Sequence, residues 1–366
     1  SRALNEIEKE LRYSSDEELG KAALYGRVFR KTPYEHLETG TVAGLKAISL
    51  EDVKTFHAAY YSRDNLSIGL GGAFGENMVD RFQSDLQRLA AGNPELVDRP
   101  RPAPIRGRQV VLVEKPGTRS TAISLGYPID LNRGSREFYA LWLANSWLGE
   151  HRNGVSRLYQ VIREARGMNY GDYSYIEAFP YGGRRNMPPT GVGRRQQLFE
   201  VWIRPVPEAR ALFALRAAIR EVERLARDGL TREQFDTQKG FLKKYHLQFA
   251  TTTSARLGYA LDDRFYGIEM GHLARFGKMM DEITLEDVNA AIRKYMQMDN
   301  MVIAMVTGDG AAMKKALISG QPTPIDYGEI QKSEKILQED REIAAFPLNI
   351  QARSVTIIPV EEMFER

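Results

Sequence analysis

The sequence predicts an α+β protein of two related lobes, each a mixed or mostly antiparallel sheet with helices on one face, and the first lobe is incomplete. The main observation is an internal repeat. Residues 48–70 read ISLEDVKTFHAAYYSRDNLSIGL and residues 283–305 read ITLEDVNAAIRKYMQMDNMVIAM, with nine of 23 aligned positions identical. The offset of 283 − 48 = 235 residues is far longer than a solenoid repeat, so it indicates the duplication of a whole domain.

Each copy of the repeated unit predicts the same local structure. Ser49 with Asp52, and Thr284 with Asp287, have the spacing of a capping box that begins a helix. A short helix follows, Asp-Asn ends it, and an apolar run comes next. The predicted unit is therefore helix, turn and strand.

The repeat also sets the domain boundaries. The second lobe begins near Arg108, so its counterpart in the first lobe would begin at 108 − 235 = −127, before the given sequence. We therefore expect residues 1–93 to form the C-terminal part of a first lobe, without its N-terminal half. The other predicted parts are a proline-rich linker at 94–107, the second lobe at 108–320 and a C-terminal tail at 321–366.

Within the second lobe, a Pro-Gly turn separates two apolar runs at 108–115 and 121–129, which predicts a β-hairpin. Two helices follow at 136–150 and 156–167, then two short strands and a long helical region. The apolar run SVTIIPV near the end of the tail predicts an edge strand.

Composition excludes several classes of protein. Fifty-one basic and 48 acidic residues are nearly balanced, so we expect no nucleic-acid partner. No apolar run approaches 18 residues, so we expect no membrane span. The chain has no cysteine, and none of its five histidines has the helical spacing of a metal pair, so the sequence alone contains no complete zinc site.

The segment SRLYQVIREARGMNY is the most informative place for chemistry. Its apolar stripe of Leu158, Val161, Ile162 and Ala165 leaves Arg163 about 140° from Leu158, on a different side of the helix. Gly167 is a suitable helix-ending residue, and Tyr170 follows closely. Arg163 and Tyr170 could then project into the same space. A surface arginine beside a packed tyrosine is the alternative that composition alone leaves open.

These residues resemble the M16 family of zinc peptidases, which includes pitrilysin, insulinase and mitochondrial processing peptidase. The family's second lobe carries a signature that this chain matches at Leu148-Gly149, Ser156-Arg157-Leu158, Ile162-Arg163-Glu164, Arg166-Gly167 and Tyr170. The substrate-binding arginine and tyrosine of the family lie seven residues apart, as Arg163 and Tyr170 do. The resemblance therefore implies that these two residues bind substrate and stabilise the oxyanion.

The resemblance also implies a zinc cofactor and one zinc ligand. The family's third ligand is a helix glutamate 25 residues before the proline of a His-Pro or similar dipeptide, and that position here is Glu8, ahead of Pro33. The equivalent position of the second lobe is Lys243, which limits a metal to the first lobe. The inverted zinc motif H-x-x-E-H is absent from the chain, so the site is incomplete in it. A helix glutamate that binds no metal is the alternative.

The expected function is that of the C-terminal portion of a zinc-dependent endopeptidase, which hydrolyses peptides or unfolded segments between two lobes. The chain alone is expected to be inactive, and the peptide is expected to add as a strand to a sheet edge. The alternatives are a non-catalytic partner subunit of an M16 heterodimer and a structural subunit like the core proteins of a respiratory complex. The expected partners are a peptide or unfolded polypeptide substrate and either a second copy of the chain or a sister M16 subunit. Only the family suggests a compartment, the bacterial periplasm or cell envelope.

Overall fold

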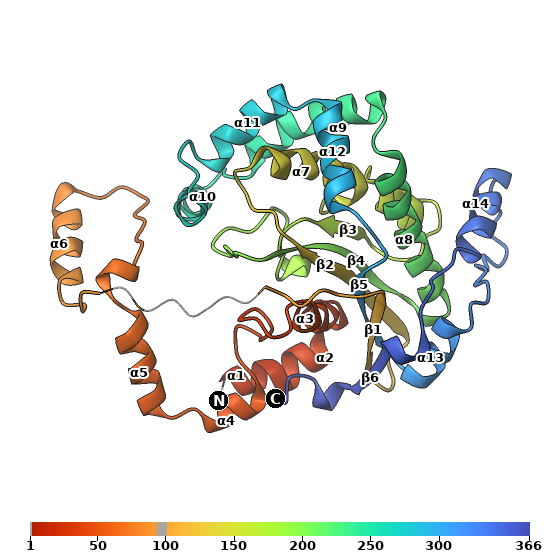
Figure 1. The fold of residues 1–366 in the computed structure, drawn as a ribbon, viewed down its shortest axis with the longest axis horizontal. Helices are drawn as coiled ribbons and strands as arrows, with labels where there is room; N and C mark the ends of the chain where they lie inside the picture. The colour runs from red at the N-terminus through yellow and green to blue at the C-terminus, as the bar shows by residue number, and fades with distance from the viewer. Residues whose placement is uncertain (1, 93, 95–100) are drawn as a thin grey trace.

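The centre of the molecule is a six-stranded mixed sheet. The computed structural model describes residues 2–92, 94 and 101–366 (Figure 1). The strand order is β3-β4-β2-β5-β1-β6. The strands are β1 (Arg108–Glu114), β2 (Ser120–Ile129), β3 (Asp172–Tyr175), β4 (Gln197–Pro207), β5 (Met301–Thr307) and β6 (Val355–Pro359). The predicted α+β class with a mixed sheet is confirmed.

The pairing of the strands corrects one prediction and confirms another. β1 and β2 do not form a hairpin, because β5 lies between them, parallel to β1 and antiparallel to β2. The connection at 115–119 is long enough to pass over one strand, and the entirely buried β5 fits a central position. The tail supplies an edge strand as expected, since β6 pairs in parallel with β1.

Two layers of helices cover one face of the sheet. The buried side chains of α7 and α8 form a single core with those of β2, β4 and β5. The helix α12 packs against both α7 and α8, and α9 and α11 also pack on α7. The helices of this lobe and the tail are α7 (Arg136–Gly149), α8 (Ala211–Asp228), α9 (Arg232–Tyr245), α10 (Thr253–Tyr266), α11 (His272–Glu282), α12 (Leu285–Tyr295), α13 (Gly310–Ile318) and α14 (Glu334–Ala344).

A helix from the N-terminal part of the chain covers the opposite face of the sheet. Leu19, Ala23 and Leu24 of α3 pack on alternate side chains of β1 and β5. Ser15 caps this helix, because its side chain accepts a hydrogen bond from the Glu18 N–H. The N-terminal elements are α1 (Arg2–Asn5), the π-helix η1 (Glu6–Leu11), α2 (Arg12–Ser14), α3 (Asp16–Val28) and α4 (Val42–Ala47).

A buried lysine also attaches α3 to the sheet. The Lys21 ammonium donates to the Phe179 carbonyl at 2.7 Å and lies 3.6 Å from a Glu200 carboxylate oxygen. It also lies 4.7 Å from the ring centres of both Tyr175 and Trp202. Because an unpaired buried ammonium would be costly, these contacts specify where α3 sits on the second lobe.

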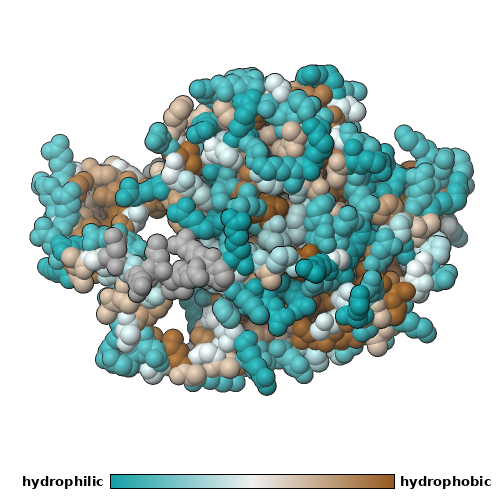
Figure 2. Space-filling model, viewed as in Figure 1, coloured by the Kyte–Doolittle hydropathy of each residue, from teal (hydrophilic) through white to brown (hydrophobic). Residues whose placement is uncertain are grey.

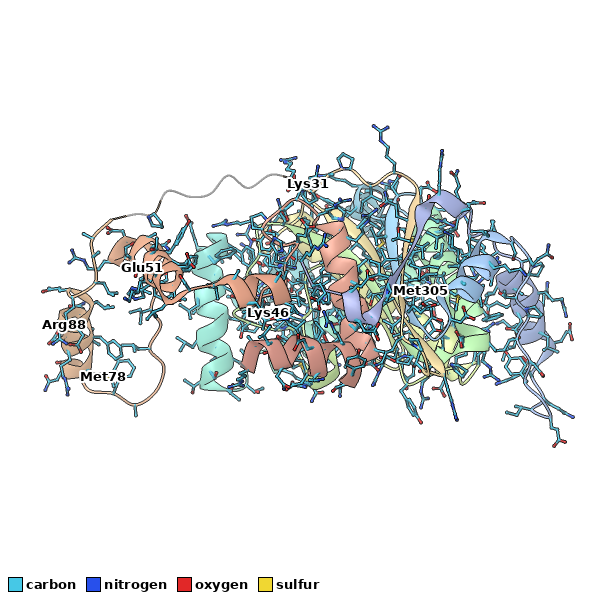
Figure 3. The ribbon with its side chains drawn as sticks, turned by 90° about the horizontal axis from the view of Figure 1, so that it is seen from below. Lys31, Lys46, Glu51, Met78, Arg88 and Met305 are labelled. Atoms are coloured by element: carbon cyan, nitrogen blue, oxygen red, sulfur yellow. The ribbon has the colours of Figure 1, made fainter. Side chains whose placement is uncertain are left out.

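Residues 48–89 extend away from the rest of the molecule, and we call them the arm (Figure 1). The arm contains α5 (Leu50–Tyr60), a 3₁₀ turn at Arg63–Asn65 and α6 (Glu76–Leu86). Figure 3 shows Glu51, Met78 and Arg88 on it, apart from Met305 in the body. Several of its apolar residues are exposed, and Figure 2 shows brown surface there.

The first copy of the repeated unit, which lies in the arm, forms the predicted helix and turn but not the predicted strand at 66–70. A strand needs a hydrogen-bonded neighbour, and no described segment pairs with these residues. The arm meets the body at α10, where Arg264 donates to the Ser67 hydroxyl at 3.0 Å. An added methyl group on Gly69 would come within 2.5 Å of Leu257, so glycine permits this contact.

Of the linker expected at 94–107, residues 95–100 lie outside the described part of the chain. The described ranges contain no helix long and apolar enough to cross a membrane.

Candidate functional site

The candidate site is built on a short helix, one face of which is buried in the core of the second lobe. Leu158, Val161 and Ile162 are buried, as the apolar stripe predicts. Residues Tyr159–Glu164 form a π-helix, with the Ala165 N–H donating to the Gln160 carbonyl at 3.0 Å. Gly167 ends the helix with φ of +61°, in the left-handed region that favours glycine. Single π-turns within helices are often found at functional sites.

Arg163 lies on this π-helix and faces away from the core, as predicted. Its side chain is 36% exposed. The guanidinium pairs with the neighbouring Glu164 at 2.9 Å and lies 5.2 Å from the ring centre of Tyr159. An ion pair at the surface contributes little stability, so the guanidinium can exchange Glu164 for another acceptor at small cost.

Tyr170 is the most exposed large hydrophobic residue among those described in the second lobe, at 79%. No side-chain hydrogen bond or ring contact involves it in the described ranges. It lies in the turn between Gly167 and β3, two residues before that strand begins rather than at its first position. The alternative of a packed tyrosine is therefore wrong, and the phenol is free to meet a ligand.

Arg163 and Tyr170 do not touch each other or Glu8 in the part of the chain that the structure describes. Both side chains are accessible, and both lie near the same helix end. Their predicted roles in binding stay predictions, because no ligand contact tests them.

A buried arginine between them anchors the helix end. The Arg166 guanidinium donates to Asp340 at 2.7 Å, to Glu339 at 2.9 Å and to the Val161 carbonyl at 2.7 Å. Asp340 and Glu339 belong to α14 in the tail, so the tail holds the segment that carries Arg163. Arg166 is part of the signature, whereas nothing in the sequence around Asp340 indicated this role.

Glu8 lies on the other π-helix, Glu6–Leu11. Its carboxylate is 3.8 Å from the Lys46 ammonium, and its side chain is 35% exposed. The described residues contain no group of three or more His, Cys, Asp or Glu side chains placed to hold a metal ion. One carboxylate paired with a lysine does not fit a zinc site by itself, so we derive no chemical step through zinc from these residues.

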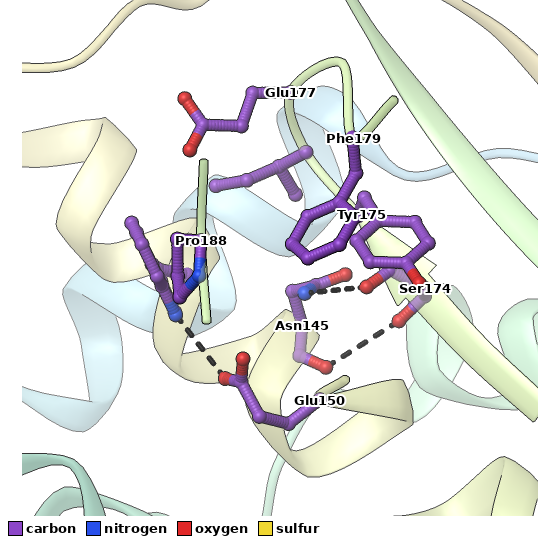
Figure 4. A pocket seen from close by; sticks show the side chains of 9 residues that line it. Asn145, Glu150, Ser174, Tyr175, Glu177, Phe179 and Pro188 are labelled. Atoms are coloured by element: carbon purple, nitrogen blue, oxygen red, sulfur yellow. Dashed lines mark hydrogen bonds between the residues drawn. The ribbon is translucent and has the colours of Figure 1, made fainter. Parts of the chain in front are cut away.

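A small cavity lies beneath β3 and α7 (Figure 4). Its volume of about 20 Å³ is enough for one water molecule and too small for a peptide. Glu150 lines it and accepts a hydrogen bond from the Trp142 indole at 3.2 Å, and burial raises the pKa of Glu150. Burial lowers the pKa of the adjacent His151 to about 4, and its ring contacts the Tyr175 hydroxyl and the Arg185 carbonyl, each at 2.8 Å. These groups form a packed polar core rather than a substrate site.

Comparison with known proteins identifies the family. Residues 47–242, more than half of the chain, match the family described as "Peptidase M16 inactive domain". The chain belongs to the M16 peptidase family. The match begins beside the first copy of the repeat and continues through the segment with Arg163 and Tyr170.

Relatives and solved structures agree with this assignment. An uncharacterized zinc protease of Mycobacterium tuberculosis is 24% identical over 281 residues, which is 74% of this chain and 58% of the relative. One from Bacillus subtilis is 23% identical over 277 residues, 74% of this chain and 61% of the relative. The M16 chain therefore spans about three fifths of the length of these relatives.

The structural neighbours support the fold alone, because their sequence identity is low. A peptidase M16 inactive domain from Pseudomonas fluorescens has a TM-score of 0.69 at 22% identity, over 83% of this chain and 69% of its own. A chain from complex III2 of Candida albicans has a TM-score of 0.67 at 13% identity. This match covers 83% of this chain and 70% of the Candida albicans chain.

Proposed function

We propose that this M16 chain is the substrate-binding portion of a zinc-dependent endopeptidase that acts on peptides or unfolded segments. The observation that supports the proposal most is the exposed pair of Arg163 and Tyr170 on a helix end that is fixed from behind. The printed names of the relatives, zinc proteases, support the same reaction class.

In this proposal the two side chains act on the main chain of the substrate. The Arg163 guanidinium donates to a substrate carbonyl after it leaves Glu164, and the exposed ion pair makes that exchange inexpensive. The Tyr170 hydroxyl donates to the oxygen that gains negative charge as the peptide bond is attacked. Because main-chain groups are the targets, we expect limited preference for substrate side chains.

Zinc belongs to the proposal for the complete protein. Among the residues present, Glu8 is the one that the family resemblance assigns to the metal, and the remaining ligands and the general base would come from residues outside this sequence. We propose accordingly that the 366 residues alone do not hydrolyse peptides.

The edge strand β3 is a poor place for strand addition by the substrate. The Asn145 side chain on α7 donates to the Ser174 carbonyl at 3.0 Å. This edge strand therefore has part of its main chain already occupied. We propose that an extended substrate pairs with a strand of the first lobe and meets Arg163 and Tyr170 with its flanking residues.

The test is peptide hydrolysis by the complete protein with Arg163→Ala or Tyr170→Phe. We expect kcat/KM to fall by about 100-fold or more with Tyr170→Phe, as for the loss of an oxyanion donor. Arg163→Ala should also lower kcat/KM, because it removes a hydrogen bond to the main chain of the substrate. Arg227→Ala is the matched control, because Arg227 is also exposed and also pairs with the acid that follows it, Asp228, at 2.8 Å. Unchanged hydrolysis in both substrate-site variants would overturn the proposal.

The second candidate is a non-catalytic subunit that supplies Arg163 and Tyr170 to a zinc-bearing sister chain. The description of the matched domain as inactive favours it. An H-x-x-E-H motif upstream in the complete protein would support the peptidase, and its absence would support the partner. If the chain were purely structural, as in a respiratory complex, Arg163→Ala would leave hydrolysis by every assembly that contains it unchanged.

A further inference from the structure

The turn that presents Tyr170 is fixed by one amide side chain. The Asn169 side-chain oxygen accepts a hydrogen bond from the Gly171 N–H at 3.2 Å. Its NH₂ group donates to the Asp172 carboxyl at 2.8 Å and to the Arg204 carbonyl at 3.0 Å. These three bonds fix the main chain on both sides of Tyr170, whose own side chain has no hydrogen-bond partner among the described residues.

The partners of Asn169 belong to two strands of the sheet. Asp172 is fully buried at the first position of β3. Arg204 lies on β4, and its N–H donates to the Gly171 carbonyl at 3.2 Å. Its guanidinium donates to Glu17 on α3 at 2.9 Å. The turn is therefore attached to two strands of the second lobe and, through Arg204, to the N-terminal helix.

The turn packs closely against the side chain of Tyr173. A methyl group added to Gly171 would come within 2.1 Å of the Tyr173 hydroxyl. Asparagine is the side chain that suits position 169, because it is short and both accepts and donates. Aspartate would keep the bond from the Gly171 N–H but lose both donated bonds, and alanine would lose all three.

We propose that Asn169 is a positioning residue that holds the main chain around Tyr170 so that the exposed phenol meets the substrate already oriented. This inference rests on the proposed function of Tyr170. The physical reason is that an exposed side chain on a loose turn would have to be ordered at each binding event. A shift of about 1 Å in a substrate-binding group can lower the rate by roughly 100-fold.

The experiment is a double-mutant cycle in the complete protein, measured as kcat/KM on an unstructured quenched-fluorescence peptide. Asn169→Ala alone should lower kcat/KM by about 10- to 100-fold. Added to Tyr170→Phe, the same change should lower it by less than about threefold, because the hydroxyl that it positions is already gone. A purely structural role would give the same fold-loss in both backgrounds, and that result would overturn the inference.

Asn169→Asp is the second variant, and it replaces Asn169→Ala in the same kcat/KM measurement if the alanine variant does not fold. It keeps the shape of the side chain, removes the two donated bonds and places a second carboxylate beside Asp172, so we expect a loss in the same direction. Asn153→Ala is the matched control, since Asn153 makes the same kind of turn bond, from the Val155 N–H at 3.2 Å, before the same helix. We expect it to change kcat/KM by less than about twofold.

A measurement that does not depend on peptide hydrolysis completes the test. Hydrogen exchange of the segment 169–175 should become faster with Asn169→Ala and stay unchanged with Tyr170→Phe. If Tyr170→Phe and Arg163→Ala both leave hydrolysis intact, the proposed function itself fails. If Tyr170→Phe lowers hydrolysis and Asn169→Ala does not, the proposed function stands and the positioning role of Asn169 is wrong.

Discussion

Ile68 and Ile303 occupy the same position in the two copies of the repeated unit, but Ile68 is 44% exposed and Ile303 is entirely buried. The same contrast holds for the identical pair Val53 and Val288, at 50% and 0%. Ile48 is 55% exposed, whereas Ile283 is 1% exposed. The second copy packs against α7, α8 and two strands, and the first copy lies in the arm, where few described residues meet it.

The helix caps of the two copies are nevertheless alike. In each, the side chain of the capping Ser49 or Thr284 accepts from a backbone N–H at 3.2 Å, and the aspartate three residues later accepts at 2.8 Å. Local sequence is therefore sufficient for the helix start, because all the partners lie within four residues. A strand needs a neighbour from elsewhere in the chain, so the same sequence pattern forms β5 in one copy and no strand in the other.

The largest difference between the copies should appear in hydrogen exchange of the isolated chain. The amides of Met301–Thr307 lie in the centre of the sheet, so we expect them to exchange only through global unfolding. The amides of residues 66–70 have no strand partner, so we expect exchange roughly 10³-fold faster or more. Slow exchange at 66–70 would show that another segment or a second molecule covers the arm.

Truncation of the matched isoleucines should give the next largest difference. Ile303→Ala creates a cavity in a buried strand and should lower the free energy of unfolding by about 2–5 kcal/mol. Ile68→Ala should change it by less than about 0.5 kcal/mol, because the arm is exposed. Urea unfolding of both variants measures the difference. Equal losses would mean that the arm folds cooperatively with the body.

Removal of the helix caps should have a smaller effect on stability than truncation of the isoleucines. The comparison is well matched, because the two caps have the same hydrogen-bond geometry. Thr284→Ala should lower the free energy of unfolding by about 1 kcal/mol, as is usual for the loss of a capping side chain. Ser49→Ala should leave global unfolding unchanged and increase exchange only within α5. A loss of global stability with Ser49→Ala would contradict the independence of the arm.

The same distinction between local and long-range interactions explains what could be predicted from the sequence. The helix at 136–149 and the helix end at Gly167 depend on nearby residues, and the sequence predicted them. The insertion of β5 between β1 and β2, the contact of Arg166 with Asp340 and the bonds of Asn169 to Arg204 join segments far apart in the chain. Arg163 and Tyr170 were selected through the resemblance to the family signature, but the groups that hold them could be found only in three dimensions.

The smallest expected effect concerns the pH dependence of the two caps. Hydrogen bonds from Arg136 lower the pKa of Asp287, and those from Ser49 lower the pKa of Asp52, which has no arginine partner. A carboxylate whose pKa is lower in the folded state adds stability above its unfolded pKa of about 3.9. That stability is lost as the pH falls through the folded-state pKa.

Asp287→Asn should therefore lower the free energy of unfolding at pH 7 by about 1 kcal/mol or less, since the Arg136 pair is partly exposed. The loss should become smaller as the pH falls below about 4, where the carboxylate of the unfolded chain is protonated in any case. Asp52→Asn should leave the curve of global stability against pH unchanged, because its cap stabilises only the arm. Urea unfolding at pH 7 and pH 3 compares the two variants. If Asp52→Asn also lowered the free energy of unfolding in a pH-dependent way, the first copy would contribute to the cooperative core despite its exposure. The difference in burial between the two copies would then not predict how much each contributes to stability.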